Sequence, residues 1–170
     1  CLLSRGLGDV YKRQLFGRET YAPKDFFASR SGIISEFKRQ SPSKGIINPT
    51  TDVEAVTKSY AEAGASMLSV LTEEKFFGGS MEYLKRARAV NNIPILRKDF
   101  IVDEYQIIEA KAIGADSILL IAGCLELKEM EKLGELAFSL GLSVLMEVHN
   151  EEELDKCLNP FITLLGVNNR

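Results

Sequence analysis

The stretch Ile95-Leu-Arg-Lys-Asp-Phe-Ile101 predicts a short buried strand that ends abruptly in charged residues. Side chains alternate between the two faces of a strand, so Leu96 and Lys98 share one face, whereas Arg97 and Asp99 share the other. A lysine aligned with a core-facing leucine must either leave the strand end for a cleft or be buried and paired with an acid. A strand whose charged end simply lies in solvent would have the same sequence pattern, so the remaining strands decide between these interpretations.

Apolar strands and amphipathic helices alternate along most of the chain. Six apolar runs predict strands at residues 33–38, 67–71, 95–98, 117–121, 143–147 and 162–167. Helical spacing of apolar residues between these runs predicts helices at about residues 53–63, 81–90, 103–113, 130–140 and 151–158. Gly64, Gly114 and Gly141 each stand between a helix and a strand, which is typical of glycines that end helices. Thr51-x-x-Glu54 predicts a capping box at the start of the first of these helices.

Strands rich in Ile, Leu and Val that alternate with helices indicate parallel pairing with right-handed crossovers. The choice lies between an open doubly wound sheet and a (β/α)8 barrel. No Gly-rich dinucleotide-binding pattern follows the first strand, and polar residues end several successive strands, which favours the barrel. A complete barrel needs about 250 residues, and this pattern stops in or just after a sixth strand. We therefore expect an α/β fold, a (β/α)8 TIM barrel present as a partial barrel of about six strands.

The domain organisation follows from where this regular pattern begins. Residues 1–14 lack useful periodicity and resemble a translated sequencing-adapter tail, so we expect them to be a non-native tail. Residues 15–31 are aromatic-rich and predict an N-terminal lead-in. Residues 32–170 are expected to form the partial TIM-barrel catalytic domain, with strands one to six.

Composition and charge exclude several classes of partner. The 170 residues are 45% hydrophobic and 26% charged with a net charge of −3, so neither a nucleic acid nor a membrane surface is expected as a partner. No apolar stretch reaches membrane-spanning length, and none resembles a secretory signal.

The cysteines Cys1, Cys124 and Cys157 lie far apart and predict reduced thiols in a cytoplasmic protein, with the last two in or near the core. The single histidine, His149, is expected near the surface, and no metal site is expected.

Polar residues at the strand ends provide candidates for chemistry. If the aligned strand faces line one barrel, six polar side chains meet at its mouth: Glu36, Lys38, Lys98, Glu147, Asn168 and Arg170. Lysines and glutamates in a partly desolvated bowl can act as proton donors and acceptors when their environments separate their pKa values. The cations can also hold a phosphate or a carboxylate. The alternative is a structural salt-bridge network, although buried ion pairs are poor stabilisers.

Six blocks of sequence, in family order and with family-like gaps, resemble the signatures of the indole-3-glycerol phosphate synthase family. They are Ser35-Glu-Phe-Lys-Arg-Gln-Ser-Pro-Ser-Lys-Gly45, Leu71-Thr-Glu-Glu-Lys-Phe-Phe-Gly-Gly-Ser80, Ile93-Pro-Ile-Leu-Arg-Lys-Asp-Phe-Ile101, Gly114-Ala-Asp-Ser-Ile-Leu-Leu-Ile121, Met146-Glu-Val-His149 and Gly166-Val-Asn-Asn-Arg170. The resemblance implies a carboxy-lyase of tryptophan biosynthesis. Such an enzyme cyclises 1-(2-carboxyphenylamino)-1-deoxyribulose 5-phosphate to indole-3-glycerol phosphate with loss of carbon dioxide and water, and needs no metal or organic cofactor.

The resemblance also implies a role for each candidate side chain. Lys98 matches the general acid that protonates the ketose carbonyl oxygen, and Glu147 matches the general base. Lys38 matches a lysine that contacts substrate and assists acid catalysis or holds phosphate. Glu36 matches a carboxylate that orients the reacting centre through Lys98 or the anilino nitrogen. Positions implied to bind substrate are Ser41, Phe77, Phe100, Leu119, Asn168 and Arg170. Without the resemblance, the two phenylalanines and Leu119 would read as core residues and Ser41 as a turn residue.

Other expectations concern the barrel strands that this sequence pattern does not include. The family barrel continues for two more strands that carry a phosphate grip, so we expect the complete gene product to be a synthase and this chain alone to be inactive, with an exposed edge strand. Fusion to or association with other tryptophan-pathway enzymes stays open. Two rival functions also remain. One is an aldolase-like barrel that uses Lys98 as a Schiff-base nucleophile, and the other is a non-catalytic half-barrel that only binds a ligand.

Overall fold

The computed structural model describes residues 31–169. The predicted tail (residues 1–14), nearly all of the lead-in and Arg170 lie outside the described residues. Within the described range, six parallel strands form one sheet in the order β1-β4-β5-β6-β7-β8. The strands are β1 (Ile34–Phe37), β4 (Met67–Leu71), β5 (Ile95–Lys98), β6 (Ser117–Ile121), β7 (Ser143–Val148) and β8 (Leu164–Val167). The predicted partial barrel of six strands is therefore confirmed.

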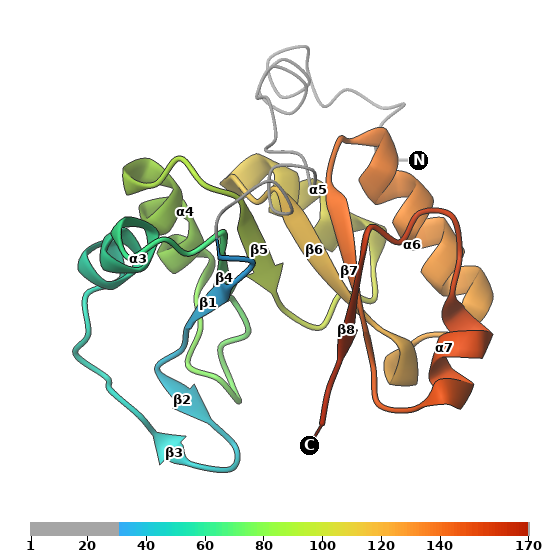
Figure 1. Cartoon of the computed structure of the whole chain (residues 1–170), viewed down its shortest axis with the longest axis horizontal. Helices are drawn as coiled ribbons and strands as arrows, with labels where there is room; N and C mark the ends of the chain where they lie inside the picture. The colour runs from blue at the N-terminus through green and yellow to red at the C-terminus, as the bar shows by residue number, and fades with distance from the viewer. Residues whose placement is uncertain (1–30, 170) are drawn as a thin grey trace.

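Five α-helices of the described chain cover the outer face of this curled sheet (Figure 1). They are α3 (Val53–Glu62), α4 (Met81–Val90), α5 (Glu104–Ile113), α6 (Leu127–Ser139) and α7 (Glu151–Cys157), with a single 3₁₀ turn η1 (Ala122–Cys124) after β6. Each strand pairs in parallel with the strand that follows the intervening helix, as in the register Leu71↔Lys98 between β4 and β5. Among the described helices, none combines the length and the apolar character that a bilayer crossing needs.

Two layers of apolar side chains hold the sheet. The layer between strands and helices includes Ile95, Ile118 and Val144. The layer on the inner, concave face consists of Met67, Leu96, Leu119 and Leu164, all buried. Neighbouring residues of β5 thus enter different layers, which confirms the predicted face of Leu96. A buried side chain of this size contributes about 1.5–3 kcal/mol, so this alternation fixes which residues of each strand face the barrel interior.

The ends of the helices follow local rules with one correction. Gly64, Gly114 and Gly141 follow the ends of three helices, as predicted, and have φ values of 95°, 101° and 71°, a left-handed conformation that favours glycine. The capping box expected at Thr51 is wrong. Asp52 caps α3 instead, because its carboxylate accepts a hydrogen bond from the backbone N–H of Ala55 at 3.2 Å.

The N-terminal ends of β5 and β6 are tied by one buried carboxylate. Asp116 is fully buried, and its Oδ2 accepts hydrogen bonds from the Ile95 backbone N–H at 2.9 Å and from Arg88 Nη1 at 2.7 Å. A buried carboxylate needs such partners because an unpaired charge away from water is costly. This contact therefore joins α4 to β5 and β6 at the amino ends of these two strands.

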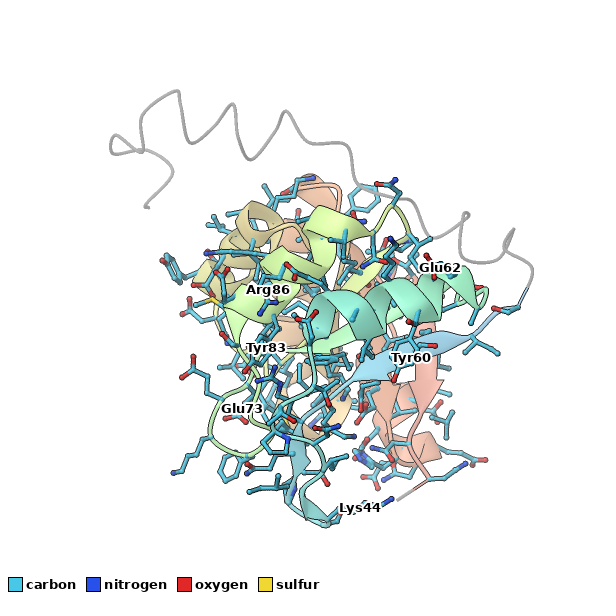
Figure 2. The ribbon with its side chains drawn as sticks, turned by 90° about the vertical axis from the view of Figure 1, so that its left-hand side faces the viewer. Lys44, Tyr60, Glu62, Glu73, Tyr83 and Arg86 are labelled. Atoms are coloured by element: carbon cyan, nitrogen blue, oxygen red, sulfur yellow. The ribbon has the colours of Figure 1, made fainter. Side chains whose placement is uncertain are left out.

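The segment after β1 carries a small hairpin that the sequence did not predict. The antiparallel strands β2 (Gln40–Ser41) and β3 (Gly45–Ile46) lie beyond the carboxyl end of β1, at the lower side of Figure 1. Figure 2 shows Lys44 at the tip of this hairpin, with Tyr83 of α4 higher in the same view. The Arg39 guanidinium joins the two regions, since its Nη1 donates to the Tyr83 hydroxyl at 2.7 Å.

The two described cysteines and the histidine have different surroundings. Cys157 is buried, as expected, and burial raises the pKa of its thiol. The expectation for Cys124 is wrong, because this residue ends the short turn η1 and is exposed. The ring of His149 lies at the surface beside Glu153, with 3.2 Å between Nδ1 and Oε2, which confirms its predicted surface position.

Candidate active site

Two strand ends bring an ammonium group and a carboxylate together. Lys98 is the last residue of β5, and Glu147 lies near the end of β7. Although they are 49 residues apart in the chain, Lys98 Nζ lies 3.3 Å from Glu147 Oε2. Both side chains project from the inner face and reach across β6, which runs between their strands. Their side chains are 26% and 16% exposed, so the pair is partly shielded yet open to a small molecule.

The other oxygen of the Glu147 carboxylate is held from β8. Asn168 Nδ2 donates a hydrogen bond to Glu147 Oε1 at 3.0 Å. Each carboxylate oxygen therefore accepts from a different side chain, one on β5 and one just beyond β8. This double hold fixes the plane of the carboxylate and keeps its oxygens at the mouth of the half-barrel.

A second acid–base pair stands at the end of β1. Lys38 Nζ lies 2.6 Å from Glu36 Oε1, and Ser69 Oγ of β4 lies 3.5 Å from Glu36 Oε2. Glu36 thus contacts Lys38 and Ser69, whereas Lys98 contacts Glu147. The mouth contains two separate pairs at its two sides rather than one network centred on Lys98.

Apolar side chains form a hollow directly beside Lys98. Phe77 and Phe100 have ring centroids 6.2 Å apart, and both line a hollow that also includes Leu119 and Lys98. Leu119 is buried in the inner apolar layer as well, so it supports the barrel and closes the base of this hollow. A planar aromatic group would find an apolar surface here within reach of the lysine ammonium.

A second and more polar hollow of about 360 Å³ opens on the β8 side of the mouth. Its lining includes Glu147, Gly166, Asn168 and Asn169. Ser41 lies in the hairpin, where it is buried, and its Oγ accepts from the Lys44 backbone N–H at 3.2 Å, a contact that fits the turn-residue interpretation.

Sequence reasoning missed how the polar residues behind Lys98 are paired. Arg97 is almost fully buried on the helix-facing side of β5 and pairs with Asp99 at 3.1 Å and with Glu109 of α5 at 2.9 Å. The shared face of Arg97 and Asp99 was predicted, but nothing in the local sequence indicated Glu109. Within residues 31–169, no group of three or more His, Cys, Asp or Glu side chains could hold a metal ion.

Comparison with known proteins gives one consistent result. A family model described as indole-3-glycerol phosphate synthase matches residues 18–170. Three curated proteins with that name are similar to the chain. The one from Chromobacterium violaceum is 55% identical over 141 residues, which cover 83% of this chain and 53% of that protein. The one from Bacteroides thetaiotaomicron is 52% identical over 143 residues, with 84% and 55% covered. The one from Dechloromonas aromatica is 50% identical over 157 residues, with 88% and 60% covered. The chain spans about half the length of these curated relatives.

Proposed function

This chain belongs to the indole-3-glycerol phosphate synthase family, and from that premise we propose that its half-barrel carries the acid–base groups of such a synthase. The substrate would be 1-(2-carboxyphenylamino)-1-deoxyribulose 5-phosphate, and the product indole-3-glycerol phosphate. The observation that carries the proposal is the contact of 3.3 Å between Lys98 and Glu147 beside an apolar hollow. That arrangement places a proton donor, a proton acceptor and a surface for an aromatic ring within one site.

The proposed reaction begins with carbon–carbon bond formation. The ring carbon that bears the carboxylate attacks the ketose carbonyl carbon, and the Lys98 ammonium donates a proton to the carbonyl oxygen as its π bond breaks. Loss of carbon dioxide then returns an electron pair to the ring. General acid catalysis of this kind contributes about 10²–10⁴-fold. Phe77, Phe100 and Leu119 support this step because they hold the ring plane beside the lysine.

Dehydration then makes the new five-membered ring aromatic. The hydroxyl formed in the first step leaves as water after it is protonated, and a proton is removed from the former methylene carbon to give the indole. Glu147 is the proposed base for that proton, with Asn168 holding its second oxygen. Lys38 and Glu36 are the proposed second pair, which assists the departure of water or orients the substrate. Ser41 and Arg170 stay predicted substrate-binding residues.

Three further assignments belong to the same proposal. Residues 32–170 form part of one catalytic unit that binds a small sugar phosphate. The protein works in the cytoplasm, which the free thiols of Cys124 and Cys157 support. Association with other tryptophan-pathway enzymes stays a prediction.

The test uses a chimera in which residues 31–169 replace the matching part of the Chromobacterium violaceum relative. Turnover is followed by the fluorescence of the indole product, which residues 31–169 do not obscure because the chain has no tryptophan. We expect Lys98→Ala and Glu147→Gln to lower kcat/KM by about 10²–10⁴-fold. Lys58→Ala is the matched control, since it removes a lysine from an exposed pair on α3.

Two results would contradict the proposed function. One is a chimera that melts cooperatively but does not turn over the substrate. The other is a Lys98→Ala chimera that keeps the rate of the parent. Trapping of a carbonyl substrate on Lys98 by borohydride would assign the lysine to Schiff-base chemistry instead.

A further inference from the structure

Arg97 lies on the helix-facing side of β5, one residue before the proposed general acid, and its side chain is 4% exposed. Three of its nitrogen atoms have different partners. Nε donates to Thr72 Oγ1 at 3.1 Å, and Nη2 donates to Asp99 Oδ2 at 3.1 Å. Nη1 donates to the Gln106 carbonyl oxygen at 2.9 Å and lies 2.9 Å from Glu109 Oε2. One guanidinium thus joins the end of β4, the end of β5 and the helix α5.

The same partners hold the backbone on both sides of the site. The Thr72 backbone N–H donates to the Lys98 carbonyl oxygen at 3.1 Å, and Thr72 Oγ1 donates to Asp99 Oδ2 at 2.6 Å. Asp99 Oδ1 accepts from the Phe100 backbone N–H at 2.9 Å. Gln106 Nε2 donates to the Phe100 carbonyl oxygen at 2.9 Å. The backbone of Lys98, the proposed acid, and of Phe100, the proposed ring contact, is therefore held by hydrogen bonds from the helix-facing side of β5.

Stability alone is a weak reason for this arrangement. A buried ion pair costs desolvation energy on both partners, and well-packed apolar residues of similar volume often stabilise as well or better. The planar fork of arginine instead supplies direction, because several N–H groups point at partners in fixed geometry, which a lysine cannot reproduce. What this fork determines is the position of the end of β5 relative to β4 and α5.

We propose that Arg97 is a positioning residue that sets the place of Lys98 and Phe100 in the site. Through Thr72, Asp99 and the backbone it keeps the Lys98 amine at its contact with Glu147 and keeps the Phe100 ring on the apolar hollow. The effect on turnover rests on the proposed function. The placement of the Lys98 amine can be measured without any substrate.

The first measurement is the acetylation rate of Lys98 in the folded chimera, read by mass spectrometry after a short pulse of acetic anhydride. The variants are Arg97→Gln and Arg97→Lys. Arg88→Gln is the matched control, because Arg88 also pairs with a buried carboxylate, Asp116, but at the opposite end of β5. Each protein is labelled at the same interval below its own melting temperature. We expect a several-fold change in Lys98 labelling in both Arg97 variants and none in Arg88→Gln.

The second measurement separates positioning from stability in turnover. A displacement of about 1 Å at a catalytic group can cost about 10²-fold in rate, so we expect kcat to fall between about tenfold and a hundredfold in the Arg97 variants. KM should change less than kcat does, because every side chain proposed to contact the ground-state substrate is still present. The pH profile of kcat should move in the Arg97 variants and keep its shape in Arg88→Gln.

The outcomes are distinguishable. If the Arg97 variants label Lys98 at the parent rate and keep its kcat, the positioning role is overturned and Arg97 is structural only. If labelling responds but the parent chimera has no turnover, the proposed function fails while the placement of Lys98 by Arg97 stands. Should Arg97→Gln not fold, Arg97→Lys, which keeps the positive charge but removes the planar fork, is decided by the same results.

Discussion

At the scale of single residues, both oxygens of the Glu147 carboxylate are held at the mouth of the half-barrel. One oxygen faces the Lys98 ammonium, and the other accepts from the Asn168 amide. A carboxylate held by two donors cannot rotate freely, so its basic lone pairs point in fixed directions. The amide is therefore expected to matter for rate even though it takes no proton.

The role of Asn168 can be tested directly. We expect Asn168→Ala to lower kcat of the chimera by about tenfold to a hundredfold, because a hydrogen bond to a charged group is worth about 1.5–3 kcal/mol. Asn169→Ala is the control, since it removes the next, exposed amide that lines the same hollow. Steady-state kinetics of both variants decide the matter, and equal small effects would remove Asn168 from the site.

The two described thiols are expected to react at different rates. Cys124 is exposed, whereas Cys157 is buried and its pKa is raised by that burial. A raised pKa leaves less thiolate at pH 8, and the thiolate is the reactive form. Iodoacetamide should modify Cys124 first, and modification of Cys157 should stay slow until the pH passes its raised pKa. Mass spectrometry of a time course checks this order, which reversed rates would contradict.

The sequence predicted which faces the site residues occupy but not how they pair. Period-two alternation placed Lys98 and Glu147 on the barrel interior because a strand offers only two faces. It could not tell that Glu36 meets Lys38, since that choice depends on the offset between strands and on side-chain reach. Arg97 and Asp99 shared a predicted face, but their contact with Glu109 depends on how α5 packs on the sheet.

At the scale of elements, the strands and helices are held at both ends by polar contacts. Asp116 joins β5, β6 and α4 at the amino ends of the strands, whereas Arg97 joins β4, β5 and α5 at their carboxyl ends. On the outer surface, Arg86 of α4 forms salt bridges with Asp52 and Glu54 at the beginning of α3. Figure 2 shows the position of Arg86.

The contribution of the Asp116 contact is large enough to measure. We expect Asp116→Ala to lower the free energy of unfolding by about 3–5 kcal/mol, because it leaves the largely buried Arg88 without this partner. Lys58→Ala breaks an exposed pair and should cost no more than about 0.5 kcal/mol. Urea denaturation of the chimera followed by circular dichroism compares the two variants. A similar loss of unfolding free energy in both would show that the Asp116 contact contributes no more than an exposed pair.

Elements with a strong period were predictable, and those set by a turn were not. Buried parallel strands are continuous apolar runs, so all six strands of the sheet were found, although β8 begins at Leu164 rather than at residue 162. The hairpin of β2 and β3 has no alternating pattern to reveal it. It forms because Gly45 adopts a φ of 63°, which a glycine provides without strain.

At the scale of the whole molecule, the described sheet has two open edges. Among residues 31–169, β8 pairs only with β7, and β1 pairs only with β4. Two apolar side chains of β8, Leu165 and Val167, are 47% and 66% exposed. A strand with free backbone groups and exposed apolar side chains is a template for pairing with another chain.

The polypeptide of 170 residues is therefore expected to self-associate through β8. Light scattering after size exclusion should show mass that rises with concentration, and Leu165→Lys with Val167→Lys should return it toward the monomer, because edge lysines oppose strand pairing. Phe138→Lys is the control, since Phe138 is an exposed apolar residue on α6 rather than on the edge strand. Loss of association in the Phe138 variant alone would place the contact elsewhere.

The sequential order of the strands has a consequence for how the polypeptide acquires its structure. Each strand of the six-stranded sheet after β1 pairs with the strand of that sheet that the ribosome makes before it, so every addition of a helix and a strand extends a sheet that already exists. Pairing with the preceding strand of the sheet closes a shorter loop, and so costs less chain entropy, than pairing with a strand farther along the chain would. The sheet can thus grow in the order in which its strands are made, and the nascent chain would bring Lys98 and Glu147 together once β7 has emerged.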